Sequence, residues 1–197
     1  MSQSKRNWEL IREPEGFQAN LETSIEKLME SGINAEPIEE VLDKVTEFHT
    51  MLLDGENHTP ENIEFLSPNQ IFVFGSNLAG EHGGGAARKA YDDFGAIWGQ
   101  GIGLQGQSYA VPTLGRSYEK LTLNEIHEHI NDLLKYCCKN RQLFFFITKI
   151  GCGIAGFSVN EIGPLFRPFI LLKNVSLPKE FYDICEKLQN ELDTKKL

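Results

Sequence analysis

Long apolar runs are absent from this sequence, and no stretch approaches the roughly 20 residues that a membrane-spanning helix requires. The first ten residues, MSQSKRNWEL, also lack the apolar segment of a signal peptide, so we expect a cytoplasmic protein with no membrane partner. Positive charge is scarce too, since 19 Lys and Arg stand against 28 Asp and Glu. The resulting net charge of −9 argues against nonspecific nucleic-acid binding, although backbone amides could still hold a small anion.

Cysteines are few, and their spacing fits no metal site. Cys137 and Cys138 are adjacent, while Cys152 and Cys185 stand alone. We therefore expect free thiols in a reducing compartment. The sequence also gives no reason to expect a metal ion or a bound cofactor.

The chain is long enough for one domain with an extension, at 197 residues. Helical spacing of apolar residues predicts two helices, over 17–31 and 37–53, followed by a polar connector over 54–70. We expect residues 1–70 to be a helical extension that docks on a domain formed by 71–197. The alternative is that the extension is a separate partner-binding module.

Beyond residue 70, short apolar segments alternate with helical patterns. Strands are predicted over 71–75, 108–112, 143–150 and 169–175, and helices over 84–94, 122–138, 158–166 and from Pro178 onward. Two of these helices open with a capping box, Thr122 with Glu125 and Ser158 with Glu161. The alternation predicts an α/β fold, with helices on both faces of a mostly parallel sheet.

Glycines gather where two predicted strands end. FGSNLAGEHGGGAARKA covers 74–90, KIGCGIAGF covers 149–157, and a third glycine-rich stretch over 95–112 could pass close to both. Each of the first two loops runs into a helix, so each can direct unpaired amides at an anion. Neither is a nucleoside-triphosphate loop, because no Gly-Lys-Ser/Thr follows. Gly151, Gly153 and Gly156 have the spacing of a dinucleotide fingerprint, but the next predicted strand lacks its acidic residue.

Two motifs resemble those of macro domains, which bind ADP-ribose. The segment 153–157, Gly-Ile-Ala-Gly-Phe, resembles their phosphate loop, and Asn77 followed by the glycines 83–85 resembles their first loop. The segments FGSNLAG, GQGIGLQGQSYA and IGCGIAG are similar to those of divergent macro-like proteins of bacteria and phages. The resemblance covers about residues 71–178. It implies a three-layer α/β/α macro-like domain with a mostly parallel mixed sheet, and ADP-ribose or an ADP-ribosylated macromolecule as partner.

The resemblance also implies roles for individual residues. Asn77 would bind the distal ribose, the two glycine loops would surround the diphosphate, and Phe157 would pack on a ribose. The full ligand-binding set it implies is Gly75, Ser76, Asn77, Gly84, Gly85, Ala86, Gly151, Cys152, Gly153, Ile154, Ala155, Gly156 and Phe157. Phe157 could instead be a core aromatic residue, and Asn77 a turn or cap residue. Cys152 could have a lowered thiol pKa, or it could be a small packing residue.

Catalysis is less clearly indicated. Many macro-domain hydrolases carry an aspartate after the glycine run, where this chain has Ala86 and Ala87. We predict Asn77, Glu81 and His82 as the catalytic residues of an ADP-ribosyl hydrolase. The nearby acids Asp92 and Asp93 are further candidates for proton transfer. Lys149 could be a cation near the phosphates. The alternatives are a noncatalytic reader of ADP-ribose or of a signalling nucleotide, and a structural protein that binds no ligand.

Overall fold

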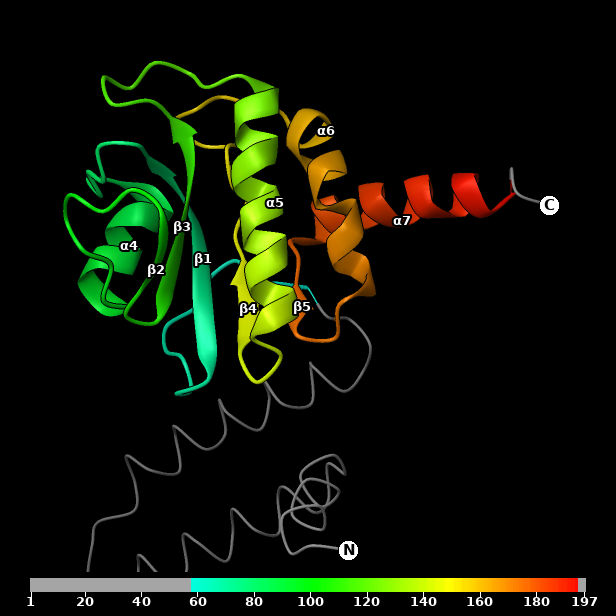
Figure 1. Ribbon diagram of the computed structural model, residues 1–197, viewed down its shortest axis with the longest axis horizontal. Helices are drawn as coiled ribbons and strands as arrows, with labels where there is room; N and C mark the ends of the chain where they lie inside the picture. Colours follow the sequence, from blue (N-terminus) through cyan, green and yellow to red (C-terminus); the bar gives the residue numbers. More distant parts are fainter. Residues whose placement is uncertain (1–57, 195–197) are drawn as a thin grey trace, which may run out of the picture. The chain divides into compact units, whose positions relative to one another are not determined.

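The computed structural model describes residues 58–194, which belong to a compact unit that comprises His58–Leu197 (Figure 1). The two helices predicted over 17–31 and 37–53 lie outside the described residues.

A five-stranded mixed sheet forms the centre of the fold, in the order β2-β3-β1-β4-β5. The strands are β1 (Gln70–Asn77), β2 (Gly103–Gln105), β3 (Ser108–Leu114), β4 (Phe144–Ile147) and β5 (Val175–Ser176). All neighbouring pairs are parallel except β2 with β3, which is antiparallel. The prediction of an α/β fold with a mostly parallel sheet is therefore confirmed.

Helices follow the strands as the sequence pattern predicts. They are α4 (Gly85–Asp93), α5 (Leu123–Lys139), α6 (Val159–Ile162), the 3-10 helix η1 (Gly163–Leu171) and α7 (Lys179–Thr194). Both predicted capping boxes are present: in α5 the Glu125 amide donates to the Thr122 hydroxyl, 3.3 Å away, and the Thr122 amide donates to the Glu125 carboxylate, 2.8 Å away. These bonds satisfy amides that the first turn of a helix leaves unpaired.

The strand predicted over 169–175 is wrong. The chain there forms η1 as far as Leu171, and only Val175 and Ser176 join the sheet as β5. Pro168 lies inside η1, directly before the predicted strand, and has no amide to donate to a neighbouring strand. Phe166 and Phe169 are both buried three residues apart, which suits a 3-10 helix because side chains at i and i+3 share a face.

Apolar residues of β1 alternate between two layers of side chains. Ile71 and Val73 belong to the core cluster that also contains residues of α5, α6, η1 and α7. Phe72 points to the opposite face, where its ring lies 4.9 Å from that of Phe94 just after α4. The period of two places α4 on one face of the sheet and α5 on the other (Figure 1).

Both edges of the sheet are covered. At β5, the Thr59 amide donates to the Leu177 carbonyl and the Thr59 hydroxyl to the Ser176 carbonyl, each at 2.8 Å. At β2, the Gln100 side-chain amide donates to the carbonyls of Ile102 and Leu104, at 3.3 and 3.0 Å. Residues from 58 onward, part of the predicted connector, thus pack on the domain.

Gly101 supports the loop that follows β1. The Ser76 hydroxyl donates to its carbonyl at 2.6 Å, and a Cβ atom added to Gly101 would lie 2.1 Å from the Asn77 carbonyl oxygen. We expect Gly101→Ala to lower the free energy of unfolding by about 1–3 kcal/mol, because the backbone must shift to relieve this clash. Urea denaturation measures the loss. Gly83→Ala is the matched control, since nothing lies within 4 Å of that position; equal stability losses in the two variants would contradict the prediction.

Candidate functional site

Two loops meet at the carboxyl ends of neighbouring strands. The first loop, residues 78–84, follows β1, and the second loop, residues 148–158, follows β4. Because β1 and β4 are adjacent and parallel, both loops emerge at the same end of the sheet, where the strands have their carboxyl ends. Open α/β sheets bind ligands at this end, beyond the carboxyl ends of their strands.

A cavity of about 550 Å³ lies between the loops, and we call it the first lobe. Its wall contains eleven of the thirteen residues predicted to bind ligand, the exceptions being Gly156 and Phe157. The remaining lining comes from Glu81, Gly83, Ala87, Thr113, Leu114, Tyr118, Thr148, Lys149 and Ile150. The third glycine-rich stretch passes under the first loop at Gly101 and is absent from this wall.

A second cavity of about 770 Å³ adjoins the first, and we call it the second lobe. The two lobes share Gly85, Ala86, Thr148 and Lys149, so they form one elongated cleft. Phe72 and Ile63 give the second lobe apolar surface, and its carboxylates are those of Glu61, Glu180 and Asp183. The cleft thus has one lobe rich in glycine and one with apolar and acidic walls.

Three glycines of the first lobe have no structural need to be glycine. Added Cβ atoms at Gly83 and Gly153 would meet nothing within 4 Å, and one at Gly84 would make only an ordinary contact, 3.9 Å from the Ile154 side chain. None of the three has a backbone φ in the left-handed region. The space above these glycines is therefore open to something other than the protein's own atoms.

Unpaired backbone amides line the same space. Gly84 precedes α4 without a side-chain cap, so the first amides of α4 have no partner within the helix. In the second loop, the amides of Gly153, Ile154 and Ala155 donate to no described residue. A helix N-terminus and a loop of free amides on opposite walls favour an anion between them.

Asn77 is held by the first loop. Its side-chain nitrogen donates to the Glu81 carbonyl at 2.8 Å, and the Glu81 amide donates to its side-chain oxygen at 3.0 Å. The side chain is only 4% exposed. Asn77 therefore fixes the backbone of Glu81 by two bonds, which agrees with the alternative that it is a turn residue; its binding of ribose stays a prediction.

Tyr118 contacts Glu81 across the first lobe, and sequence reasoning missed it. The Tyr118 hydroxyl donates to the Glu81 carboxylate, and both side chains line the lobe. The available signal was its position: residues 115–121 follow β3, whose carboxyl end lies at the same edge as the two loops. We call residues 115–121 the strap.

His82 and Phe157 lie outside the first lobe. His82 is fully buried, with Nε2 3.1 Å from the Ile97 carbonyl and its ring edge against Phe74. Phe157 is buried in the core cluster, with the Lys120 ammonium 3.5 Å from its ring centroid. The location of Phe157 agrees with the alternative that it is a core aromatic residue, and His82 has no access to a ligand in the cleft.

Of the two alternatives for Cys152, the structure favours a small packing residue over a thiol with a lowered pKa. Burial raises the pKa of this thiol above its usual value, although the charge of Lys149 opposes the effect. A half-buried thiol that stays protonated near neutral pH is a poor nucleophile. Cys152 therefore acts as a small residue in the wall of the cleft. All four cysteines are free thiols.

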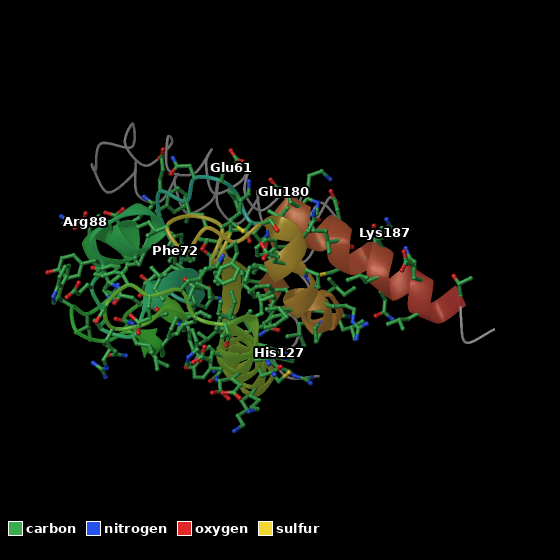
Figure 2. The ribbon with its side chains drawn as sticks, turned by 90° about the horizontal axis from the view of Figure 1, so that it is seen from above. Glu61, Phe72, Arg88, His127, Glu180 and Lys187 are labelled. Atoms are coloured by element: carbon green, nitrogen blue, oxygen red, sulfur yellow. The ribbon has the colours of Figure 1, made fainter. Side chains whose placement is uncertain are left out.

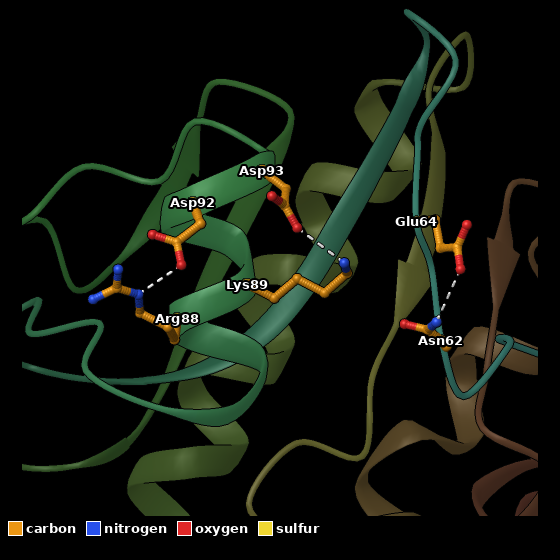
Figure 3. Close-up of polar contacts among 6 residues, drawn as sticks. All are labelled: Asn62, Glu64, Arg88, Lys89, Asp92 and Asp93. Atoms are coloured by element: carbon orange, nitrogen blue, oxygen red, sulfur yellow. Dashed lines mark hydrogen bonds and ion pairs between the residues drawn. The ribbon is translucent and has the colours of Figure 1, made fainter.

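Every lysine that lines the second lobe is already paired with a carboxylate. Lys149 contacts Glu180 at 2.6 Å and Glu61 at 3.3 Å, and the hydrogen bond to Glu180 raises its pKa. Figure 2 shows Glu61 and Glu180 on the same side of the molecule. On α4, Lys89 pairs with Asp93 at 2.9 Å, beside the pair of Arg88 with Asp92 (Figure 3). On α7, Lys179 lies 3.4 Å from Asp183. An anion in the cleft would therefore depend chiefly on backbone amides.

Residues 58–194 contain no group of three or more His, Cys, Asp or Glu side chains that could hold a metal ion. No helix in this part of the chain is both long and apolar enough to cross a membrane. No family model, curated protein or solved structure matches the chain.

Proposed function

We propose that the cleft binds ADP-ribose or a closely related nucleotide diphosphate-sugar. The observation that carries this proposal is the open space above Gly83, Gly84 and Gly153, where neither backbone angle nor neighbouring atoms require glycine. Glycine at such positions lets the backbone approach a ligand closely. The unpaired amides around this space suit a diphosphate, because amides bind anions without a basic surface.

The shape of the cleft supports the rest of the ligand. The second lobe has the apolar side chains of Phe72 and Ile63 against which a base could pack, and carboxylates that could accept from an exocyclic amino group. The first lobe would hold the diphosphate and the sugar beyond it. The sheet, with glycine loops at the ends of two adjacent parallel strands, supports our assignment of a macro-like fold.

Isothermal titration calorimetry tests the proposal. We expect ADP-ribose to bind at one site, and AMP to bind about tenfold more weakly or worse, because AMP offers no diphosphate to the amides of both loops. Absence of binding by ADP-ribose, ADP and AMP alike would refute the proposed function. Equal affinities for AMP and ADP would refute the placement of the diphosphate.

Hydrolysis of an ADP-ribosyl linkage is a second candidate function. Glu81 carries the only carboxylate among the described residues that line the first lobe, and no ion pair in residues 58–194 neutralises it. Such a carboxylate could orient and deprotonate a water molecule. The assay is release of ADP-ribose from mono-ADP-ribosylated protein or nucleic acid by wild type and Glu81→Gln. Tight binding with no release from any substrate would leave the protein a reader.

A further inference from the structure

The strap brings Tyr118 over the first lobe from the third strand that ends at this edge. Tyr118 is 49% exposed, yet its hydroxyl is committed to the carboxylate of Glu81, 37 residues earlier in the chain. Glu81 is itself fixed through its backbone by Asn77. The pair thus joins the strap to the first loop at the wall of the first lobe, and neither residue lines the second lobe.

Tyr118 adopts an unfavourable backbone conformation. Its φ of 63° is the only positive φ among the described non-glycine residues. A bulky residue in the left-handed region is strained, and such strain is concentrated at functional sites. No hydrophobic packing accounts for it, because the ring is half exposed.

The strap is held in this conformation from several sides. The Gly115 amide donates to the Glu119 carbonyl and the Ser117 amide to the Glu119 carboxylate, each at 2.8 Å. At the other end, the Lys120 ammonium donates to the Gly156 carbonyl at 3.3 Å and lies on the Phe157 ring. The strap therefore contacts both ligand-facing loops, and Tyr118 is presented at a defined place.

The hydrogen bond between the two side chains determines what they can offer a ligand. The proton of the Tyr118 hydroxyl is used by Glu81, so the phenol oxygen is left as an acceptor. The bond to Glu81 also raises the pKa of Tyr118 above its usual value, so the phenol keeps its proton as a donor to Glu81. The second carboxylate oxygen of Glu81 has no partner among residues 58–194 and is also an acceptor.

We propose that Tyr118 and Glu81 together bind two neighbouring hydroxyls of the sugar at the end of the ligand. Two acceptors side by side match a vicinal diol, which has two donors, and one of them carries negative charge, which repels phosphate. The pair therefore selects a nucleotide diphosphate that ends in an unphosphorylated sugar over one that ends in phosphate. This inference rests on the proposed function, because it assumes the diphosphate between the glycine loops.

The test compares ADP-ribose, ADP and ATP by calorimetry in wild type, Tyr118→Phe and Glu81→Gln. Wild type should bind ADP-ribose about tenfold or more tightly than ADP, because hydrogen bonds to a charged group are strong, and should bind ATP no better than ADP. Each variant should reduce the ratio of ADP-ribose to ADP affinity severalfold, with the larger reduction in Glu81→Gln because Tyr118→Phe keeps the carboxylate, and neither variant should lower the affinity for ADP. Glu81→Gln should also improve ATP binding relative to ADP.

Two controls match these substitutions. Tyr91→Phe removes a hydroxyl from another exposed tyrosine, on α4, and Glu128→Gln removes a carboxylate from the exposed face of α5; neither residue lines the cleft. Both controls should keep the wild-type ratio, and unfolding temperatures verify that all four variants fold. If Tyr118→Phe and Glu81→Gln keep the wild-type ratio, the inference is overturned, although the proposed function stands. If wild type binds neither ADP-ribose nor ADP, the proposed function itself fails.

Discussion

We expect the Gly153→Val variant to lose affinity for ADP-ribose by about 100-fold or more while keeping the wild-type unfolding temperature. A valine side chain would occupy the open space over the second loop, and it would hold the diphosphate away from the amides of residues 153–155. The protein itself should tolerate the change, because no atom lies within 4 Å of an added Cβ.

Gly99→Ala provides the opposite result as a control. Gly99 also has open space around it, but its φ of 91° is unfavourable for alanine, and it lines neither lobe. We expect this variant to lose about 1–2 kcal/mol of unfolding free energy and no affinity. Calorimetry and thermal unfolding of both variants give the comparison. Normal ADP-ribose binding by Gly153→Val would show that the second loop does not hold the phosphates.

The second large effect is expected at Asn77. Asn77→Asp keeps the acceptor for the Glu81 amide but replaces the donor to the Glu81 carbonyl with a carboxylate oxygen. Because the side chain is buried, we expect a loss of about 1–3 kcal/mol in unfolding free energy, measured by urea denaturation. The first loop should also move, so affinity for ADP should fall together with affinity for ADP-ribose.

Comparison of the two ligands separates the roles of Asn77. A residue that positions the loop affects both ligands, whereas a residue that binds only the distal ribose would affect ADP-ribose and leave ADP unchanged. Asn124→Asp makes the same chemical change in the exposed first turn of α5, away from the cleft; it should leave both affinities unchanged and should not lower the free energy of unfolding, because negative charge at a helix N-terminus is favourable. If Asn77→Asp lost affinity for ADP-ribose and kept its affinity for ADP, Asn77 would instead bind the distal ribose, as the resemblance to macro domains implies.

Local sequence patterns predicted the fold correctly where an element depends on interactions between residues close together in the chain. The capping boxes at Thr122 and Ser158 mark true helix starts, because side chain and backbone lie within one turn. The strand predicted over 169–175 is wrong because apolar content alone does not distinguish a strand from a 3-10 helix, and because Pro168 just before it disfavours a strand.

The site was predictable in its backbone but not in its side chains. The glycine loops follow two buried strands, and topology brings them together at the sheet edge. The burial of His82 depends on Phe74 and Ile97, and the contact of Tyr118 with Glu81 joins residues from separate loops. Such contacts are set by tertiary packing and leave no spacing signal in the sequence.

The coverage of the sheet edges limits how copies of this domain can associate. A second chain extends a sheet only by donating to, and accepting from, the unpaired backbone groups of an edge strand. Beside β2 the Gln100 amide already occupies the carbonyls of Ile102 and Leu104, and beside β5 the backbone of Thr59 takes the place that an added strand would need. Growth of the sheet from one copy into the next would first have to displace these groups, and the exposed side chains of Ile102 and Leu104 lie beside the edge that Gln100 covers.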